Sequence, residues 1–115
     1  MNKRNAITEA GLTKDDGTTI LGYLRSRDYK QAFLHMAAVG VGDLPEATGT
    51  FFIAKALAKS GHVRKDLPAV QKASRETYME SRKGGFSPYR IERIYKIHKW
   101  VTGIRNAYVA SLAPE

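Results

Sequence analysis

Apolar residues recur at intervals of three and four along most of this chain, and no segment alternates between apolar and polar side chains. The strongest pattern begins at Ser87-Pro88, a favourable helix cap followed by a proline suited to the first turn. In the helix that follows, one broad apolar face contains Ile91, Ile94, Tyr95, Ile97, His98 and Val101. Trp100 is expected on the opposite, polar face. The pattern predicts an all-α fold, a bundle of about five to seven helices.

Three weaker helical patterns precede this one, and another follows it. Residues 18–24 and 28–38 predict two helices, the second with Tyr29 and Phe33 on one face. Residues 46–60 are rich in alanine and predict the central core helix, which Gly61 would end. Residues 104–112 predict a last helix, which could cover Trp100 or pair with a second subunit.

Length and composition indicate one domain. The chain has 115 residues and is 43% hydrophobic, which suffices for a single core. Residues 1–17 are mostly polar and are predicted to form a flexible N-terminal arm. Residues 18–115 are predicted to form the helical domain. The chain has no cysteine, which excludes disulfides and thiolate metal sites. No apolar run of about 18 residues and no secretory signal pattern is present, so we expect a cytoplasmic protein.

The distribution of charge points to a polyanionic partner. The formal net charge is +8, and it is not spread evenly. Residues 1–50 hold six basic and six acidic side chains, whereas residues 51–115 hold thirteen basic and five acidic ones. Because the whole excess lies in one half, we favour nucleic acid as the partner over a uniformly solvated basic surface.

Residues 63–84 lie in this basic half, and their pattern predicts a helix-turn-helix made of two short helices. Val63, Leu67 and Val70 form one apolar face of the first helix. Ser74 is a good N-cap for the second helix, which Gly84-Gly85 would end. This second helix is poor in apolar residues, as is typical of a DNA-recognition helix that offers its surface to a groove.

The predicted recognition helix supplies two sets of candidate DNA contacts. Residues expected to read base edges are Ser74, Arg75, Glu76, Thr77 and Met79. Arg75 is suited to a guanine edge and Glu76 to the amino group of cytosine. Residues expected to contact phosphates are Arg64, Lys65, Arg82, Lys83 and Arg90, since they flank the helix pair with positive charge.

Short matches in one order also give the chain a resemblance to a known family. They are Tyr23-Leu24-Arg25-Ser26, Ala32-Phe33-Leu34, Gly42-Asp43, Ala54-Lys55-Ala56-Leu57-Ala58-Lys59-Ser60-Gly61, Ser74-Arg75-Glu76-Thr77 and Gly85-Phe86-Ser87-Pro88. In these, the chain resembles the addiction-module antidote proteins, which are antitoxins with a lambda-repressor-like helix-turn-helix. The resemblance implies a transcriptional regulator that binds double-stranded DNA as a homodimer, represses its own operon and neutralises a partner toxin. Residues 103–113 are the candidate dimer element.

Two other functions remain open from the sequence. The helical scaffold could be a protein-interaction module, such as a phage or plasmid inhibitor, whose basic half binds an acidic protein. It could also bind single-stranded nucleic acid by stacking bases on Tyr89, Trp100 or Tyr108. We expect no enzyme, no cofactor and no metal, because no carboxylate pair, metal-spaced ligand set or phosphate-binding glycine loop stands out.

Overall fold

A computed structural model describes residues 11–111, with side chains described as far as residue 108. Its elements are α2 (Lys14–Arg25), α3 (Tyr29–Ala38), η1 (Val41–Asp43), α4 (Glu46–Lys59), η2 (Arg64–Asp66), α5 (Leu67–Lys83) and α6 (Pro88–Ser111), where η marks a short 3-10 helix. Over this range the protein consists of five α-helices and two 3-10 turns, with no strand. The predicted all-α fold is therefore confirmed.

Helix α2 begins at Lys14, inside the segment predicted to be a flexible arm. The Thr13 hydroxyl accepts a hydrogen bond from the Asp16 amide at 3.1 Å and caps the helix. Asp15 and Asp16 lie in the first turn, where negative charge favours a helix N-terminus. Gly17 is buried. The arm prediction is thus wrong for residues 14–17, because a cap and two acidic residues start a helix there, and residues 1–10 lie outside the described range.

The core lies where α3 and α4 meet one side of α5 and α6, with α2 packed on α3 and α4. Its largest fully buried side chains include Phe33 of α3, Phe52 of α4 and Ile94 of α6. Trp100 belongs to this core and is only 5% exposed, so its predicted place on a polar face is wrong. Its ring lies against Gly49, where the absence of a side chain lets α4 approach α6 closely.

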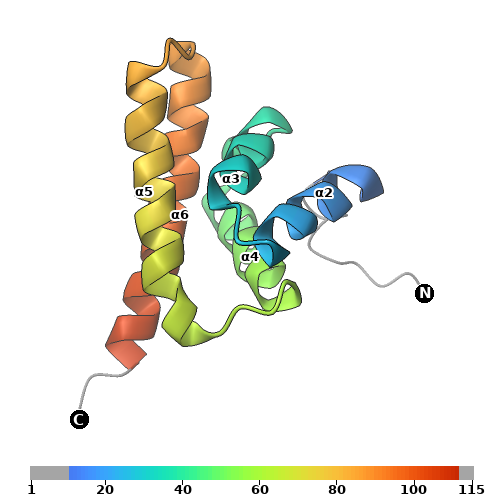
Figure 1. Cartoon of the computed structure of the whole chain (residues 1–115), viewed down its shortest axis with the longest axis vertical. Helices are drawn as coiled ribbons and strands as arrows, with labels where there is room; N and C mark the ends of the chain where they lie inside the picture. The colour runs from blue at the N-terminus through green and yellow to red at the C-terminus, as the bar shows by residue number, and fades with distance from the viewer. Residues whose placement is uncertain (1–10, 112–115) are drawn as a thin grey trace.

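Helices α5 and α6 form a long antiparallel hairpin, with α3 and α4 packed against one side of it and α2 packed against α3 and α4 (Figure 1). The turn between them uses Gly85, whose φ of 76° lies in the left-handed region that glycine adopts without strain. Ser87 then caps α6 as predicted, since its hydroxyl accepts a hydrogen bond from the Arg90 amide at 3.2 Å. The expected separate helix over residues 104–112 is, as far as Ser111, the continuation of α6, and Leu112 lies outside the described residues.

The predicted corner between two short helices at residues 72–74 does not exist. One continuous helix runs from Leu67 to Lys83, preceded only by the η2 turn. Between Ala69 and Lys83 the chain has no glycine or proline to stop a helix. The Ser74 hydroxyl donates to the carbonyl of Gln71 at 2.8 Å and caps nothing. In place of the helix-turn-helix predicted at residues 63–84, this segment forms the η2 turn and the first helix of the hairpin, α5.

Candidate nucleic-acid interface

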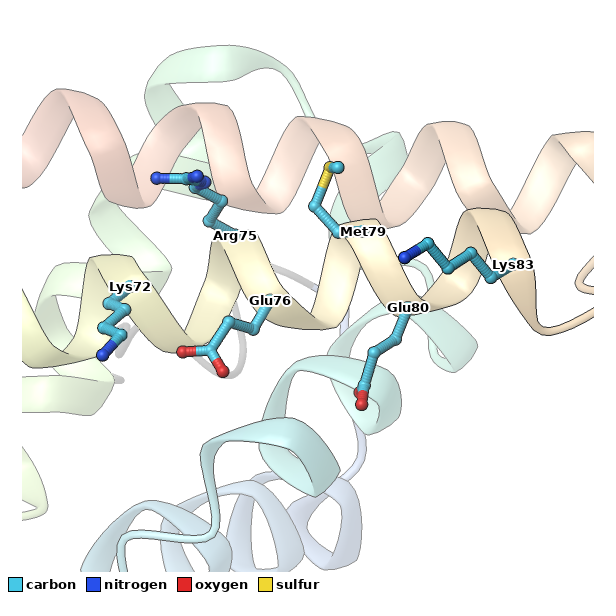
Figure 2. Close-up of a pocket in the computed structure, with 6 residues that line it drawn as sticks. All are labelled: Lys72, Arg75, Glu76, Met79, Glu80 and Lys83. Atoms are coloured by element: carbon cyan, nitrogen blue, oxygen red, sulfur yellow. The ribbon is translucent and has the colours of Figure 1, made fainter.

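The outward surface of α5 carries a stripe of alternating charge, which we call the α5 stripe: Lys72, Arg75, Glu76, Met79, Glu80 and Lys83. These residues line a shallow depression of about 340 Å³. Figure 2 shows Arg75 and Met79 leaning toward α6, while Glu76 and Glu80 point to the side on which α3 lies. Arg75 is thus the stripe cation that lies next to α6, whereas Lys72, Glu76 and Glu80 point to the other side.

Three of the five predicted base-reading residues lie on this stripe. Arg75 and Glu76 are exposed, and Met79 is 44% exposed despite its apolar side chain. They project from successive turns of one helix face, so a flat or grooved partner can contact them together. The structure therefore brings together Arg75, Glu76 and Met79 in the way that the sequence predicted.

The other two, Ser74 and Thr77, are buried at 2% and 3% exposure, so their predicted contact with DNA is wrong. The Thr77 hydroxyl donates to the Ala73 carbonyl at 2.8 Å, which satisfies it within its own helix. A sequence signal for this burial does exist. Val63, Leu67, Val70, Ser74, Thr77 and Ser81 follow one another at alternating steps of four and three, a continuous helix face in which small hydroxyl residues replace the expected aliphatic ones.

Small residues on this face let α5 and α6 lie close together. Ser74 also faces α6, where its hydroxyl lies 2.9 Å from Nδ1 of His98. Burial, assisted by the charge of Arg75, holds the pKa of His98 below its ordinary value. The pair joins α5 to α6 inside the hairpin, where Ser74 is 2% exposed. His98, which the sequence places on the apolar face of its helix, is thus partly buried and hydrogen-bonded.

All five predicted phosphate-contact residues are exposed, and they form two groups. Arg64 and Lys65 lie in η2 at the start of α5, whereas Arg82, Lys83 and Arg90 lie around the hairpin turn. The 17 residues of α5 separate the groups by roughly 26 Å, at a rise of about 1.5 Å per residue. Arg90 is held over the Phe86 ring at 4.7 Å. The α5 stripe is thus flanked by cations at both ends.

Most cations of the hairpin have no internal counter-charge. Helices α5 and α6 hold nine basic and three acidic residues. Within the described part of the chain, Arg93 is the one of these nine that forms an ion pair, with Asp43 of η1. Arg93 also lowers the pKa of Asp43 by donating a hydrogen bond to it. One carboxylate of the stripe, Glu80, is itself paired with Lys30 of α3 at 3.3 Å.

Residues 11–111 offer neither a metal site nor a membrane span. No group of three or more histidine, cysteine or acidic side chains there is arranged to hold a metal ion. None of the described helices is long and apolar enough to cross a membrane. Comparison of the chain with protein-family models, with curated proteins and with solved structures found no match.

Proposed function

We propose that this protein binds double-stranded DNA through the α5 stripe and acts as a transcriptional regulator. The observation that carries the proposal is the excess of unpaired cations on the α5–α6 hairpin. Lysine and arginine contacts to phosphates release condensed counterions, and this release supplies most of the non-specific affinity of DNA-binding proteins. A surface that neutralises so few of its own charges is suited to such a partner.

The shape of α5 supports insertion into the major groove. An α-helix with its side chains is about 10–12 Å wide, which matches a groove about 12 Å wide. In this arrangement α5 takes the part of a recognition helix, without the short preceding helix of a helix-turn-helix. Arg75 faces a guanine edge, Glu76 the amino group of a cytosine, and Met79 a thymine methyl group.

The two cationic groups, roughly 26 Å apart along α5, would contact phosphates near the two ends of the bound helix. Arg64 and Lys65 serve one end, and Arg82, Lys83 and Arg90 the other. Since one helix reads few base pairs, a homodimer on two half-sites would supply the remaining specificity. The proposal also includes a role as an autorepressing antitoxin with a toxin partner. This role follows only from the family resemblance.

The test is fluorescence anisotropy with duplex DNA selected from a random library, measured over a range of salt concentrations. We compare the wild type with a triple variant of the stripe, Lys72→Gln, Arg75→Gln and Lys83→Gln. The matched control removes the same charge elsewhere, through Lys14→Gln, Lys55→Gln and Lys59→Gln on α2 and α4. The stripe variant should bind more weakly, and its salt slope should fall by about 0.9 for each phosphate that the protein no longer neutralises.

The control variant should bind nearly as the wild type does. Equal weakening of both triple variants would show that net charge alone matters and would refute the α5 interface. Absence of binding to any duplex at low salt would refute the function itself. Arg75→Ala, measured on the selected site, should cost about 1–3 kcal/mol while leaving binding to unselected duplex largely intact.

A further inference from the structure

A second surface of the hairpin, which we call the aromatic seam, lies where α5 and α6 meet. It consists of Tyr78, Tyr95 and His98. The Tyr78 ring is 5.3 Å from the Tyr95 ring and 6.0 Å from the His98 ring, measured between centroids. The Tyr78 and His98 planes differ by only 11°, so they are stacked. Tyr95 is 45% exposed, which leaves much of its ring open to a ligand.

The seam borders a groove of about 390 Å³, lined by Tyr78, Arg82, Pro88, Ile91, Glu92 and Tyr95. All of these residues come from α5 or α6, so α2, α3 and α4 leave the groove uncovered. Four of its six lining residues are apolar or aromatic, and the other two, Arg82 and Glu92, are charged. Such a groove accepts a flat ring more readily than a fully charged chain.

Cations surround the seam. The Arg82 guanidinium lies 5.8 Å from the centre of the Tyr78 ring. Arg75 is exposed and close enough to lower the pKa of His98. Lys99 is exposed one helical turn beyond Tyr95 on the same side of α6. Among the residues that line the groove, Glu92 is the one carboxylate that offsets these three cations. The charge therefore favours an anionic ligand that also carries aromatic rings.

We infer that the aromatic seam stacks an unpaired nucleobase on Tyr95, with Arg82 and Lys99 holding the adjoining phosphates. Base stacking on an aromatic side chain, beside a cationic track, is how single-stranded segments are held without sequence preference. Glu92 is placed to accept a hydrogen bond from an exocyclic amino group of the base. This inference rests on the proposed function. It predicts that the protein binds a duplex with a short single-stranded extension more tightly than it binds a blunt duplex.

The seam differs from the stacking site expected from the sequence. That expectation relied on Trp100, which is buried, on Tyr89, which lies elsewhere on α6 and donates a hydrogen bond to Asp43 at 3.0 Å, and on Tyr108, which lies in the last turns of α6. Tyr89 is 59% exposed and so provides a matched control for Tyr95. Both are exposed tyrosines of α6, but only Tyr95 lines the groove.

The experiment measures anisotropy with three labelled probes: a blunt duplex, the same duplex with a 3′ extension of five thymidines, and the extended strand alone. Wild-type protein should bind the extended duplex about tenfold more tightly than the blunt one. Tyr95→Ala should abolish this gain, whereas Tyr95→Phe and Tyr89→Ala should retain it. Far-UV circular dichroism verifies that each variant is folded, and the phenylalanine variant separates stacking from any effect of the hydroxyl.

The outcomes separate the two proposals. If wild-type protein binds the blunt duplex and gains nothing from the extension, or if Tyr95→Ala keeps the gain, the stacking site is refuted and the duplex function stands. If only the single strand is bound and Tyr95→Ala abolishes that binding, the duplex function is refuted and the stacking site stands. If no probe is bound, both are refuted.

Discussion

At Gly49 the backbone of α4 passes directly beneath the ring of Trp100. A Cβ atom added there would lie 2.6 Å from Cε3 of that ring, far inside van der Waals contact. Gly49→Ala should therefore destabilise the fold by about 1–3 kcal/mol, as expected for overpacking of a filled core. Urea unfolding followed by the fluorescence of Trp100, the single tryptophan, measures this change.

Gly103 provides the control, because it is also a glycine within a helix but a Cβ atom there meets nothing within 4 Å. Gly103→Ala should leave stability unchanged or raise it by up to about 1 kcal/mol, through its better helix propensity. Equal stability of the two alanine variants would contradict the close approach of α4 and α6.

His62 is a second residue whose environment has a measurable consequence. Its Nδ1 accepts a hydrogen bond from Arg27 at 3.2 Å, and its Nε2 lies 2.8 Å from the Tyr29 hydroxyl. Burial, reinforced by the nearby charge of Arg27, lowers the pKa of His62, and Asp66 opposes this only in part. A protonated His62 would direct an Nδ1–H toward the Arg27 guanidinium, so the folded protein favours the neutral ring.

Stability should consequently decrease as the pH falls below the ordinary histidine pKa of about 6.5. The lowered pKa means that the unfolded chain binds the proton first, and the free energy of unfolding decreases until the folded-state pKa is passed. Urea unfolding at pH of about 7.5 and 5.5 should show this decrease, and His62→Gln should reduce it. A remainder should persist, since burial also lowers the pKa of His98. A wild type equally stable at both values would contradict this account.

At the scale of the element, the continuity of α5 is the feature that most alters the expected interface. If Lys72 lies in the interior of a helix, as observed, Lys72→Gly should be less stable than Lys72→Ala by about 1 kcal/mol. If a turn lay there instead, glycine would be tolerated as well as alanine. Chemical denaturation of the two variants distinguishes a continuous helix from a broken one, because Lys72 is exposed and either change leaves the core intact.

The same helix shows what could and could not be predicted from the sequence. Periodicity sufficed for the all-α fold and for the outward position of Arg75, Glu76 and Met79, and the Ser-Pro pair sufficed for the cap at Ser87. It failed at Ser74, because the sequence does not distinguish a serine that caps a helix from a serine that donates a hydrogen bond to a backbone carbonyl within its own helix. The arrangement of α5 against α6 decides between them, and that packing depends on residues more than twenty positions away, such as His98.

The prediction for Trp100 failed for a related reason. On a helical wheel Trp100 falls outside the apolar face of α6, and it would be exposed if that face alone were buried. Helix α6 instead packs against α3, α4 and α5, so more than one of its faces is buried. The available signal was Gly49, since a glycine inside a predicted helix can reflect a close approach by a neighbour, although Gly103 shows that it need not. The aromatic seam was likewise missed, because Tyr78 and Tyr95 come from different helices and meet only in the hairpin.

At the scale of the whole molecule, one core joins the hairpin to the other helices. Fully buried side chains come from every described α-helix, including Ile20 of α2, Met36 of α3, Ile53 of α4, Val70 of α5 and Ile97 of α6. The radius of gyration is 13.8 Å, close to the value of about 13 Å expected for one compact domain of this length. The hairpin therefore has no core of its own on which it could remain folded alone.

This shared core predicts a single cooperative unfolding transition. Trp100 reports the contact between α4 and α6, while far-UV circular dichroism reports the helix content of the entire chain. Because neither group of helices can keep its apolar side chains buried without the other, the two signals should give the same urea midpoint. Gly49→Ala should shift both midpoints together to lower urea. Early loss of the Trp100 signal while helicity persists would instead show that the hairpin and α2, α3 and α4 unfold as separate units, so that the proposed DNA-binding surface is stable by itself.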